Sequence, residues 1–226
     1  MAADTSSDQH NLSGSGADAP HSATMDAASS RTLSHYQSTS EQFWAATRDH
    51  DVRQNIDALL SALPTTPGQR ILDIGCGPGR DLMAFKAQGH APVGLDGTPR
   101  FVEMAREHSG CEVWHQNLLS LDLPAGRFDG IFANAVLFHI PSSHLPAALQ
   151  QLFQSLRPGG VLFSSNPRGQ NQEGFQGERY GVWHDLEQWR RYLETAGFSY
   201  LDHYFRPTGL PFEQQPWLAS LWQRPL

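Results

Sequence analysis

The feature that most constrains this chain is a short apolar run, residues 70–74, that ends in three alternating glycines. Gly75, Gly77 and Gly79 stand at every second position, and a segment of helical character follows from Arg80. Glycine adopts backbone angles that other residues avoid and leaves no side chain between the main chain and a ligand. The stretch is typical of a strand, a tight nucleotide-binding turn and a helix start in an α/β domain.

The spacing of the glycines separates two kinds of nucleotide site. Dehydrogenases use G-x-G-x-x-G, and Arg80 stands where their third glycine would be. Here the order is an acidic residue, Asp73, and then G-x-G-x-G. In this the sequence resembles the class I methyltransferases that depend on S-adenosylmethionine (SAM). The resemblance implies a SAM site built from the first motif: Asp73, Gly75, Cys76, Gly77 and Gly79.

Further motifs of the resembled family follow in order between residues 69 and 163. The apolar run 91–96 ends in Asp96, and an acid at the tip of a second strand can accept hydrogen bonds from ribose hydroxyls. Asn117 stands where the family usually has an aspartate for the adenine amino group, and an amide oxygen can also accept that bond. Residues 128–139 and 156–163 match the fourth and fifth strands. These motifs add Asp96, Gly97, Asn117, Leu118 and Asn134 to the expected SAM site.

The fold expected from this series is α/β. The resemblance implies a Rossmann-like open seven-stranded sheet with helices on both faces and the last strand antiparallel, with the methyl donor between its first and fourth strands. Residues 198–206 and 217–224 alternate like two antiparallel strands around a proline-rich loop and would complete the sheet. Each motif alone has a simpler explanation, because a glycine turn can serve close packing and a carboxylate after a strand can cap a helix.

The chain divides into a tail and one domain. Residues 1–33 are rich in small and polar side chains and hold few large apolar ones, so we predict a disordered polar tail. It lacks the basic start and apolar centre of a secretory signal, and Met25 is an alternative start. A single domain follows over residues 34–226. We expect helices within residues 34–66, which in the resembled family cap the SAM pocket.

The polar, glycine-rich segment 166–183 leaves the end of the fifth strand. Connections of this length in a compact domain are usually functional or disordered. Open α/β sheets bind ligands at the carboxyl ends of their strands. We therefore predict an acceptor-site lid over residues 166–183, and the alternative is a flexible surface loop.

The acceptor site is predicted from polar and aromatic residues in these segments. His139, at the exit of the fourth strand, is the candidate general base if the acceptor is a hydroxyl or a protonated amine, and a neutral packed histidine is the alternative. We expect no metal, because the acids beside His50 point to different faces of a helix. The expected acceptor contacts are Tyr36, Trp44, Arg48, Phe138, Arg168, Arg179 and Tyr180.

Composition limits the partners. The formal net charge is −7 and no arginine-rich stripe occurs, which argues against contact with a nucleic-acid backbone. No apolar stretch is long enough to cross a membrane. The two cysteines, Cys76 and Cys111, lie in core motifs and suggest free thiols in a reducing cytoplasm.

We therefore expect transfer of a methyl group from SAM to a small polar molecule, with S-adenosylhomocysteine as the second product. The alternatives are a protein or RNA methyltransferase, a catalytically silent SAM-binding regulator and, further off, a Rossmann dehydrogenase.

Overall fold

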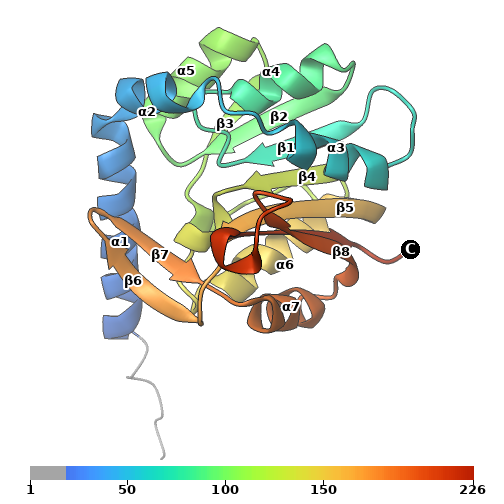
Figure 1. The fold of residues 1–226 in the computed structure, drawn as a ribbon. Coiled ribbons are helices and arrows are strands. Elements are labelled where there is room, and N and C mark those ends of the chain that lie inside the picture. The colour runs from blue at the N-terminus through green and yellow to red at the C-terminus, as the bar shows by residue number, and fades with distance from the viewer. Residues whose placement is uncertain (1–18) are drawn as a thin grey trace, which may run out of the picture.

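Seven strands form one mixed sheet at the centre of the computed structural model, which describes residues 19–226 (Figure 1). The strands are β1 (Arg70–Ile74), β2 (Ala91–Asp96), β3 (Glu112–His115), β4 (Phe128–Asn134), β5 (Leu156–Pro167), β8 (Ser199–Arg206) and β9 (Trp217–Gln223). Their order is β3-β2-β1-β4-β5-β9-β8, and β9 is antiparallel to both of its neighbours. The predicted fold class is confirmed, including the two antiparallel strands at the C-terminus.

Helices cover both faces of the sheet. Helices α3 (Arg53–Ala62), α4 (Arg80–Ala87) and α5 (Pro99–Ser109) pack on one face, and α6 (Leu145–Ser155) and α7 (Leu186–Thr195) on the other (Figure 1). The central strands are apolar on both sides because both are covered. Phe132 and Phe163, for example, stack at 5.0 Å between ring centres and are fully buried.

The direction in which the chain adds strands to the sheet reverses between β1 and β4. The chain runs outward from β1 to β2 and β3, and then crosses to β4 on the other side of β1. The connections that leave the carboxyl ends of β1 and β4 therefore diverge and open a crevice between them. Two single-turn helices, η1 (Leu118–Ser120) and η2 (Leu137–His139), follow β3 and β4 at this edge, and a third, η3 (Phe212–Gln214), lies between β8 and β9.

The predicted disordered tail is wrong over residues 19–33, which belong to helix α1 (Ala19–Ser38), while residues 1–18 lie outside the described part. A second helix, α2 (Ser40–Thr47), follows at once. α1 is stabilised by close packing of small residues: Ala28 and Thr32 are each 4% exposed, and the Thr32 hydroxyl accepts a hydrogen bond from Tyr180 N at 2.9 Å. Because the residues that α1 buries are small, a prediction based on the content of large apolar side chains does not detect this helix.

Part of segment 166–183, expected as a loop, is an ordered hairpin of β6 (Gln172–Gln176) and β7 (Arg179–Trp183). β5 itself continues to Pro167. The hairpin lies along α1 (Figure 1). Arg31 of α1 pairs with Glu178 at 2.8 Å and lies over the Phe175 ring at 4.4 Å. Helix and hairpin thus form one layer, called the roof below.

Within residues 19–226, no helix has both the length and the apolar character needed to cross a membrane.

Candidate active site

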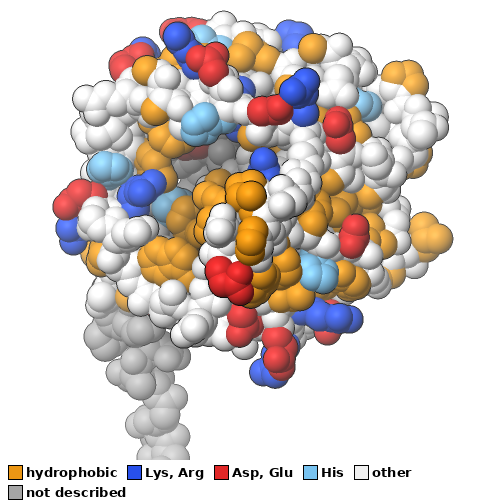
Figure 2. Space-filling model, viewed as in Figure 1, with side chains coloured by type: hydrophobic (Ala, Val, Ile, Leu, Met, Phe, Trp, Pro, Cys, Tyr) orange, Lys and Arg blue, Asp and Glu red, His pale blue; other side chains and the backbone are white. Residues whose placement is uncertain are grey.

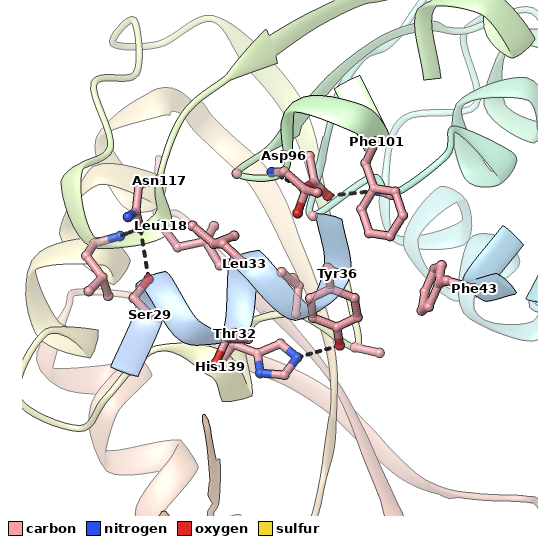
Figure 3. Close-up of a pocket in the computed structure, with 17 residues that line it drawn as sticks. Ser29, Thr32, Leu33, Tyr36, Phe43, Asp96, Phe101, Asn117, Leu118 and His139 are labelled. Atoms are coloured by element: carbon pink, nitrogen blue, oxygen red, sulfur yellow. Dashed lines mark hydrogen bonds between the residues drawn. The ribbon is translucent and has the colours of Figure 1, made fainter. Parts of the chain in front are cut away.

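A cavity lies at the carboxyl ends of β1, β2 and β4, with α1 across it (Figure 3). The space-filling view shows a hollow near the middle of the same face of the molecule (Figure 2). Eight predicted site residues line the cavity: Tyr36, Gly75, Gly77, Asp96, Gly97, Asn117, Leu118 and His139.

Each of the three positions in the turn requires glycine for a different physical reason. Gly75 has φ of 67°, and a Cβ there would lie 2.2 Å from Val136 Cγ2. At Gly79 a Cβ would meet the Ala105 backbone at 2.9 Å, so this glycine lets α4 approach α5. At Gly77 the nearest atom would be Phe43 Cε1 at 3.6 Å, across the cavity wall. Gly75 and Gly77 therefore shape the cavity, and Gly79 serves packing.

Asp96 is held at the cavity wall by two backbone hydrogen bonds. Its Oδ2 accepts from Gly77 N at 3.0 Å and its Oδ1 from Thr98 N at 2.8 Å. Burial raises the pKa of Asp96, and the bonds from Thr98 and Gly77 oppose that rise. Each oxygen keeps a lone pair for a ligand hydroxyl.

Asn117 caps η1 and also faces the cavity. Its Oδ1 accepts from Leu119 N at 3.0 Å and lies 3.5 Å from Ser29 Oγ of α1. An amide oxygen has two lone pairs, so a ligand amino group would take the place of the long contact to Ser29 while the bond from Leu119 N is kept.

Four residues of the predicted SAM site do not line the cavity: Gly79, described above, and Asp73, Cys76 and Asn134. Asp73 lies beneath the glycine turn, 2% exposed, and its Oδ2 has no hydrogen-bond partner among the described residues. Burial, and then Asp81, raise the pKa of Asp73 well above its usual range. Cys76 packs behind the turn, where burial raises the pKa of its thiol. Asn134 bonds to Asn55 Nδ2 of α3 at 2.9 Å.

Tyr36 and His139 form a hydrogen-bonded pair that also lines the cavity (Figure 3). The Tyr36 hydroxyl lies 3.0 Å from His139 Nε2, and His139 Nδ1 lies 2.6 Å from the Tyr180 carbonyl oxygen. Because a carbonyl only accepts, the proton of a neutral ring is on Nδ1, and Nε2 accepts from the tyrosine. The pair is therefore oriented, and Tyr36 lies between His139 and part of the cavity.

Burial sets the protonation of this pair. It lowers the pKa of His139 from 6.5 to about 4, although the bond to the Tyr180 carbonyl opposes the change. Burial also raises the pKa of Tyr36, and Arg179 opposes that rise. At neutral pH the site therefore holds an uncharged imidazole and an uncharged phenol.

The remaining predicted acceptor contacts divide into two groups. Trp44 stacks on His108 at 4.6 Å, and Arg48 pairs with Asp49 in solvent, so neither lines the cavity. Arg168 is also turned away, since its Nε donates to the Gln215 carbonyl at 2.6 Å.

Phe138, Arg179 and Tyr180 surround the Tyr36–His139 pair instead. Phe138 lies 4.0 Å from the His139 ring centre, and Tyr180 contributes the carbonyl that His139 contacts.

Sequence reasoning missed part of the cavity lining, above all the contribution of α1. The unpredicted lining residues are Ser29, Thr32, Leu33, Phe43, Thr98, Phe101, Leu119, Ala135 and Val136. Thr98 and Leu119 could have been found, because each directly follows a strand-end motif. The α1 residues carried no comparable signal, since the segment was interpreted as a polar tail.

Cys76 and Cys111 are both free thiols, as predicted. Across residues 19–226 no three His, Cys, Asp or Glu side chains are grouped in a way that could hold a metal ion.

Comparison with known proteins identifies the family to which this chain belongs. Residues 44–210 match the family model described as a methyltransferase domain. The chain belongs to the class I SAM-dependent methyltransferases. The match covers the glycine turn, Asp96, Asn117 and His139, and the family's methyl donor is SAM.

Curated relatives of this methyltransferase act on different acceptors. It is 31% identical over 137 residues to a malonyl-[acyl-carrier protein] O-methyltransferase of Enterobacter lignolyticus, covering 60% of this chain and 50% of that protein. It is 34% identical over 116 residues to a trans-aconitate 2-methyltransferase of Azoarcus, covering 50% and 45%. The chain thus spans about half the length of the curated relatives it matches.

Among solved structures, one neighbour covers almost the whole chain. The 1,6-didemethyltoxoflavin-N1-methyltransferase of Burkholderia thailandensis, with bound 1,6-didemethyltoxoflavin and S-adenosylhomocysteine, has a TM-score of 0.71 and 19% identity. The match covers 96% of this chain and 93% of that one. At this identity the likeness is one of fold.

Proposed function

We propose that this methyltransferase transfers the methyl group of SAM to a small polar acceptor, leaving S-adenosylhomocysteine. The observation that carries the proposal is the oriented Tyr36–His139 pair, which lines the same cavity as Asp96 and Asn117. The two free thiols support a reducing, cytoplasmic location within the same proposal.

The cavity wall fits the methyl donor. Asp96 offers two free lone pairs to ribose hydroxyls, Asn117 offers an amide oxygen to the adenine amino group, and Gly75 and Gly77 leave the backbone bare. The rings of Tyr36, Phe43 and Phe101 lie 5.1–5.8 Å apart and form an aromatic wall. Aromatic faces attract cations, which suits a sulfonium ligand.

Asp73, Cys76, Gly79 and Asn134 act in this proposal from behind the cavity. Asp73 and Cys76 support the glycine turn, Gly79 lets its helix pack, and Asn134 ends β4.

When bound, SAM supplies an electrophilic methyl carbon, which an acceptor atom attacks in line with the breaking carbon–sulfur bond. This chain orients the acceptor and removes its proton. The proton passes to the Tyr36 oxygen while the Tyr36 proton passes to His139 Nε2, across the 3.0 Å that separates them. The Tyr180 carbonyl holds the tautomer of His139 in which Nε2 can accept. His139 is thus the final base and Tyr36 the group that meets the acceptor.

The roof favours small acceptors over macromolecules. α1 lies across the cavity and the hairpin packs against α1, held by the contacts at Arg31–Glu178 and Thr32–Tyr180. A folded protein or an RNA would have to displace this layer. In the proposal, the hairpin is the lid expected from the sequence.

The test is release of S-adenosylhomocysteine by the purified full-length chain, supplied separately with the small-molecule and macromolecular fractions of a cell extract. We expect turnover with small molecules only. The variant Tyr36→Phe should lower kcat about 100-fold and leave SAM affinity unchanged, because general acid–base steps contribute at least this much.

The matched control is Tyr200→Phe, since Tyr200 makes a similar pair with His203 on β8, at 2.6 Å, away from the cavity. Turnover with macromolecules alone would favour a protein or RNA methyltransferase. SAM binding without turnover in either fraction would favour the regulator.

A further inference from the structure

Strand β7 presents two different faces to its surroundings. Side chains alternate along a strand, so Arg179, Gly181 and Trp183 share one face and Tyr180 and Val182 the other. Tyr180 and Val182 are buried against Ala28 of α1. A Cβ at Gly181 would lie 3.2 Å from Phe138 Cδ2. The face that carries Arg179 therefore meets η2, the short helix that holds His139.

Several other charged groups of the roof and its surroundings already have partners. Arg31 pairs with Glu178, and Arg168 donates to the Gln215 carbonyl and lies 3.6 Å over the Phe212 ring. Glu173 accepts from Ser142 N at 3.0 Å. Of the two arginines of segment 166–183 that were predicted to contact the acceptor, Arg168 is therefore already engaged and Arg179 remains.

Arg179 is the exception. Across the described residues, no carboxylate lies within ion-pair distance of its guanidinium. Its charge nevertheless acts on the site, since it opposes the rise in the pKa of Tyr36 and lowers the pKa of His139. Arg179 therefore has no carboxylate partner in the described part of the chain, and its guanidinium lies within hydrogen-bonding reach of Tyr36, beside the pair that would deprotonate the acceptor.

The described residues that line the cavity include no cation. The one charged group among them at neutral pH is Asp96, whose negative charge raises the pKa of Tyr36, whereas Tyr36 and His139 are uncharged. Arg179, beside the cavity, therefore supplies positive charge next to the Tyr36–His139 pair.

Resting on the methyl transfer proposed above, we propose that Arg179 binds an anionic oxygen group of the acceptor, a carboxylate or a phosphate, beside the atom that meets Tyr36. A guanidinium suits this role because its planar fork of N–H donors matches two oxygens of either group. The acceptor class is thus a small molecule with a hydroxyl or amine nucleophile next to an oxyanion. The hairpin would then select the acceptor as well as cover it.

Calorimetric titration of the full-length chain, saturated with S-adenosylhomocysteine, tests this site with three probes: inorganic phosphate, malonate and the neutral malonamide. We expect at least one anion to bind and malonamide not to bind. Arg179→Gln should weaken anion binding about tenfold or more, since hydrogen bonds between charged groups contribute this much. The matched control, Arg48→Gln, removes an arginine that pairs with Asp49 outside the cavity and should change nothing.

Each outcome decides a separate question. Binding of phosphate alone, or of malonate alone, identifies the group that the acceptor carries. The site is overturned if Arg179→Gln binds anions as the parent does, if malonamide binds as well as malonate, or if S-adenosylhomocysteine binds and neither anion does. Failure to bind S-adenosylhomocysteine at all would instead count against the methyl transfer itself.

Discussion

Different kinds of contact hold together the two sides of the cavity, the roof and the strand ends opposite it, called the floor here. The floor is made of strand ends and a glycine turn, where Gly75 meets Val136 and Gly79 meets Ala105 with no room for another atom. The roof is joined by polar contacts, such as the half-exposed Arg31–Glu178 pair, and by small residues such as Ala28. In the proposed function, the ligand common to the family would contact mainly the packed floor, and the acceptor would contact the roof, whose contacts are weaker.

The largest expected effect comes from two glycine substitutions that test how tightly the floor is packed. Gly75→Ala should lower the free energy of unfolding by about 3 kcal/mol or more, because the new methyl group overlaps Val136 in a left-handed backbone. Gly77→Ala makes the same chemical change with 3.6 Å of space, and should cost only about 1 kcal/mol of backbone strain. Denaturant unfolding of both variants measures the difference. Equal losses at the two positions would show that the floor is not as tightly packed as described.

The next largest effect concerns SAM binding. Asp96→Ala should weaken SAM affinity about 100-fold, since a carboxylate that accepts from two hydroxyls is lost. Isothermal titration gives the dissociation constant, and Asp96→Asn, which keeps one oxygen for the backbone donors, separates binding from folding. Glu107→Ala on the exposed side of α5 is the control. Unchanged affinity in Asp96→Ala would remove Asp96 from the cofactor site.

His139 follows β4 of the floor and contacts the Tyr180 carbonyl of the roof. Its titration should make the stability of the protein depend on pH. The pKa of its folded state, about 4, lies below the ordinary value of 6.5, so the unfolded chain binds more protons between these values. Stability from the neutral ring is therefore complete above pH 6.5 and is lost as pH falls towards 4. Because the ring lines an open cavity, we expect about 1–2 kcal/mol over this window.

Unfolding curves at several pH values check this, with His139→Gln as the reference that lacks the titrating ring. The wild type should lose stability relative to the variant as the solution becomes more acidic. Parallel pH profiles for the two proteins would mean that His139 titrates as a solvated histidine does.

The smallest effect belongs to the roof. The Arg31 and Glu178 side chains are 48% and 56% exposed, so their mutual coupling should be only about 0.5 kcal/mol. A double-mutant cycle of Arg31→Ala and Glu178→Ala measures it, and added salt should reduce it. A coupling above about 2 kcal/mol would show that the roof is as firmly fixed as the floor.

The sequence could predict the floor because its physics is local. Three glycines in five residues, an apolar run before them and an acid after the next run describe a turn whatever else the chain does. Each motif also marks the end of one strand, but the architecture of the sheet was expected from the resemblance to the methyltransferase family, because local motifs do not say which strands are neighbours. The structure adds the purpose of each glycine, which depends on neighbours such as Val136 and Ala105 that no spacing rule identifies.

The roof could not be predicted in the same way. Helix α1 buries Ala28 and Thr32 against a hairpin about 150 residues later in the chain, and neither side chain is strongly apolar. Trp44 and Arg48 were expected at the acceptor because aromatic and charged side chains stand out in a sequence. The structure shows them engaged with His108 and Asp49 instead. Long-range polar contacts leave almost no mark on local composition.

Tyr180 contacts three residues, each through a different one of its own groups. Its amide donates to Thr32 of α1, its ring is buried with Ala28, and its carbonyl contacts His139 Nδ1. Docking of the helix and choice of the histidine tautomer therefore pass through one residue. A chain with β7 displaced loses the carbonyl that keeps the proton on Nδ1. In the proposed mechanism, docking of the roof and preparation of His139 as the base would therefore occur together, and a donor bound before docking would lie beside a histidine without a fixed tautomer.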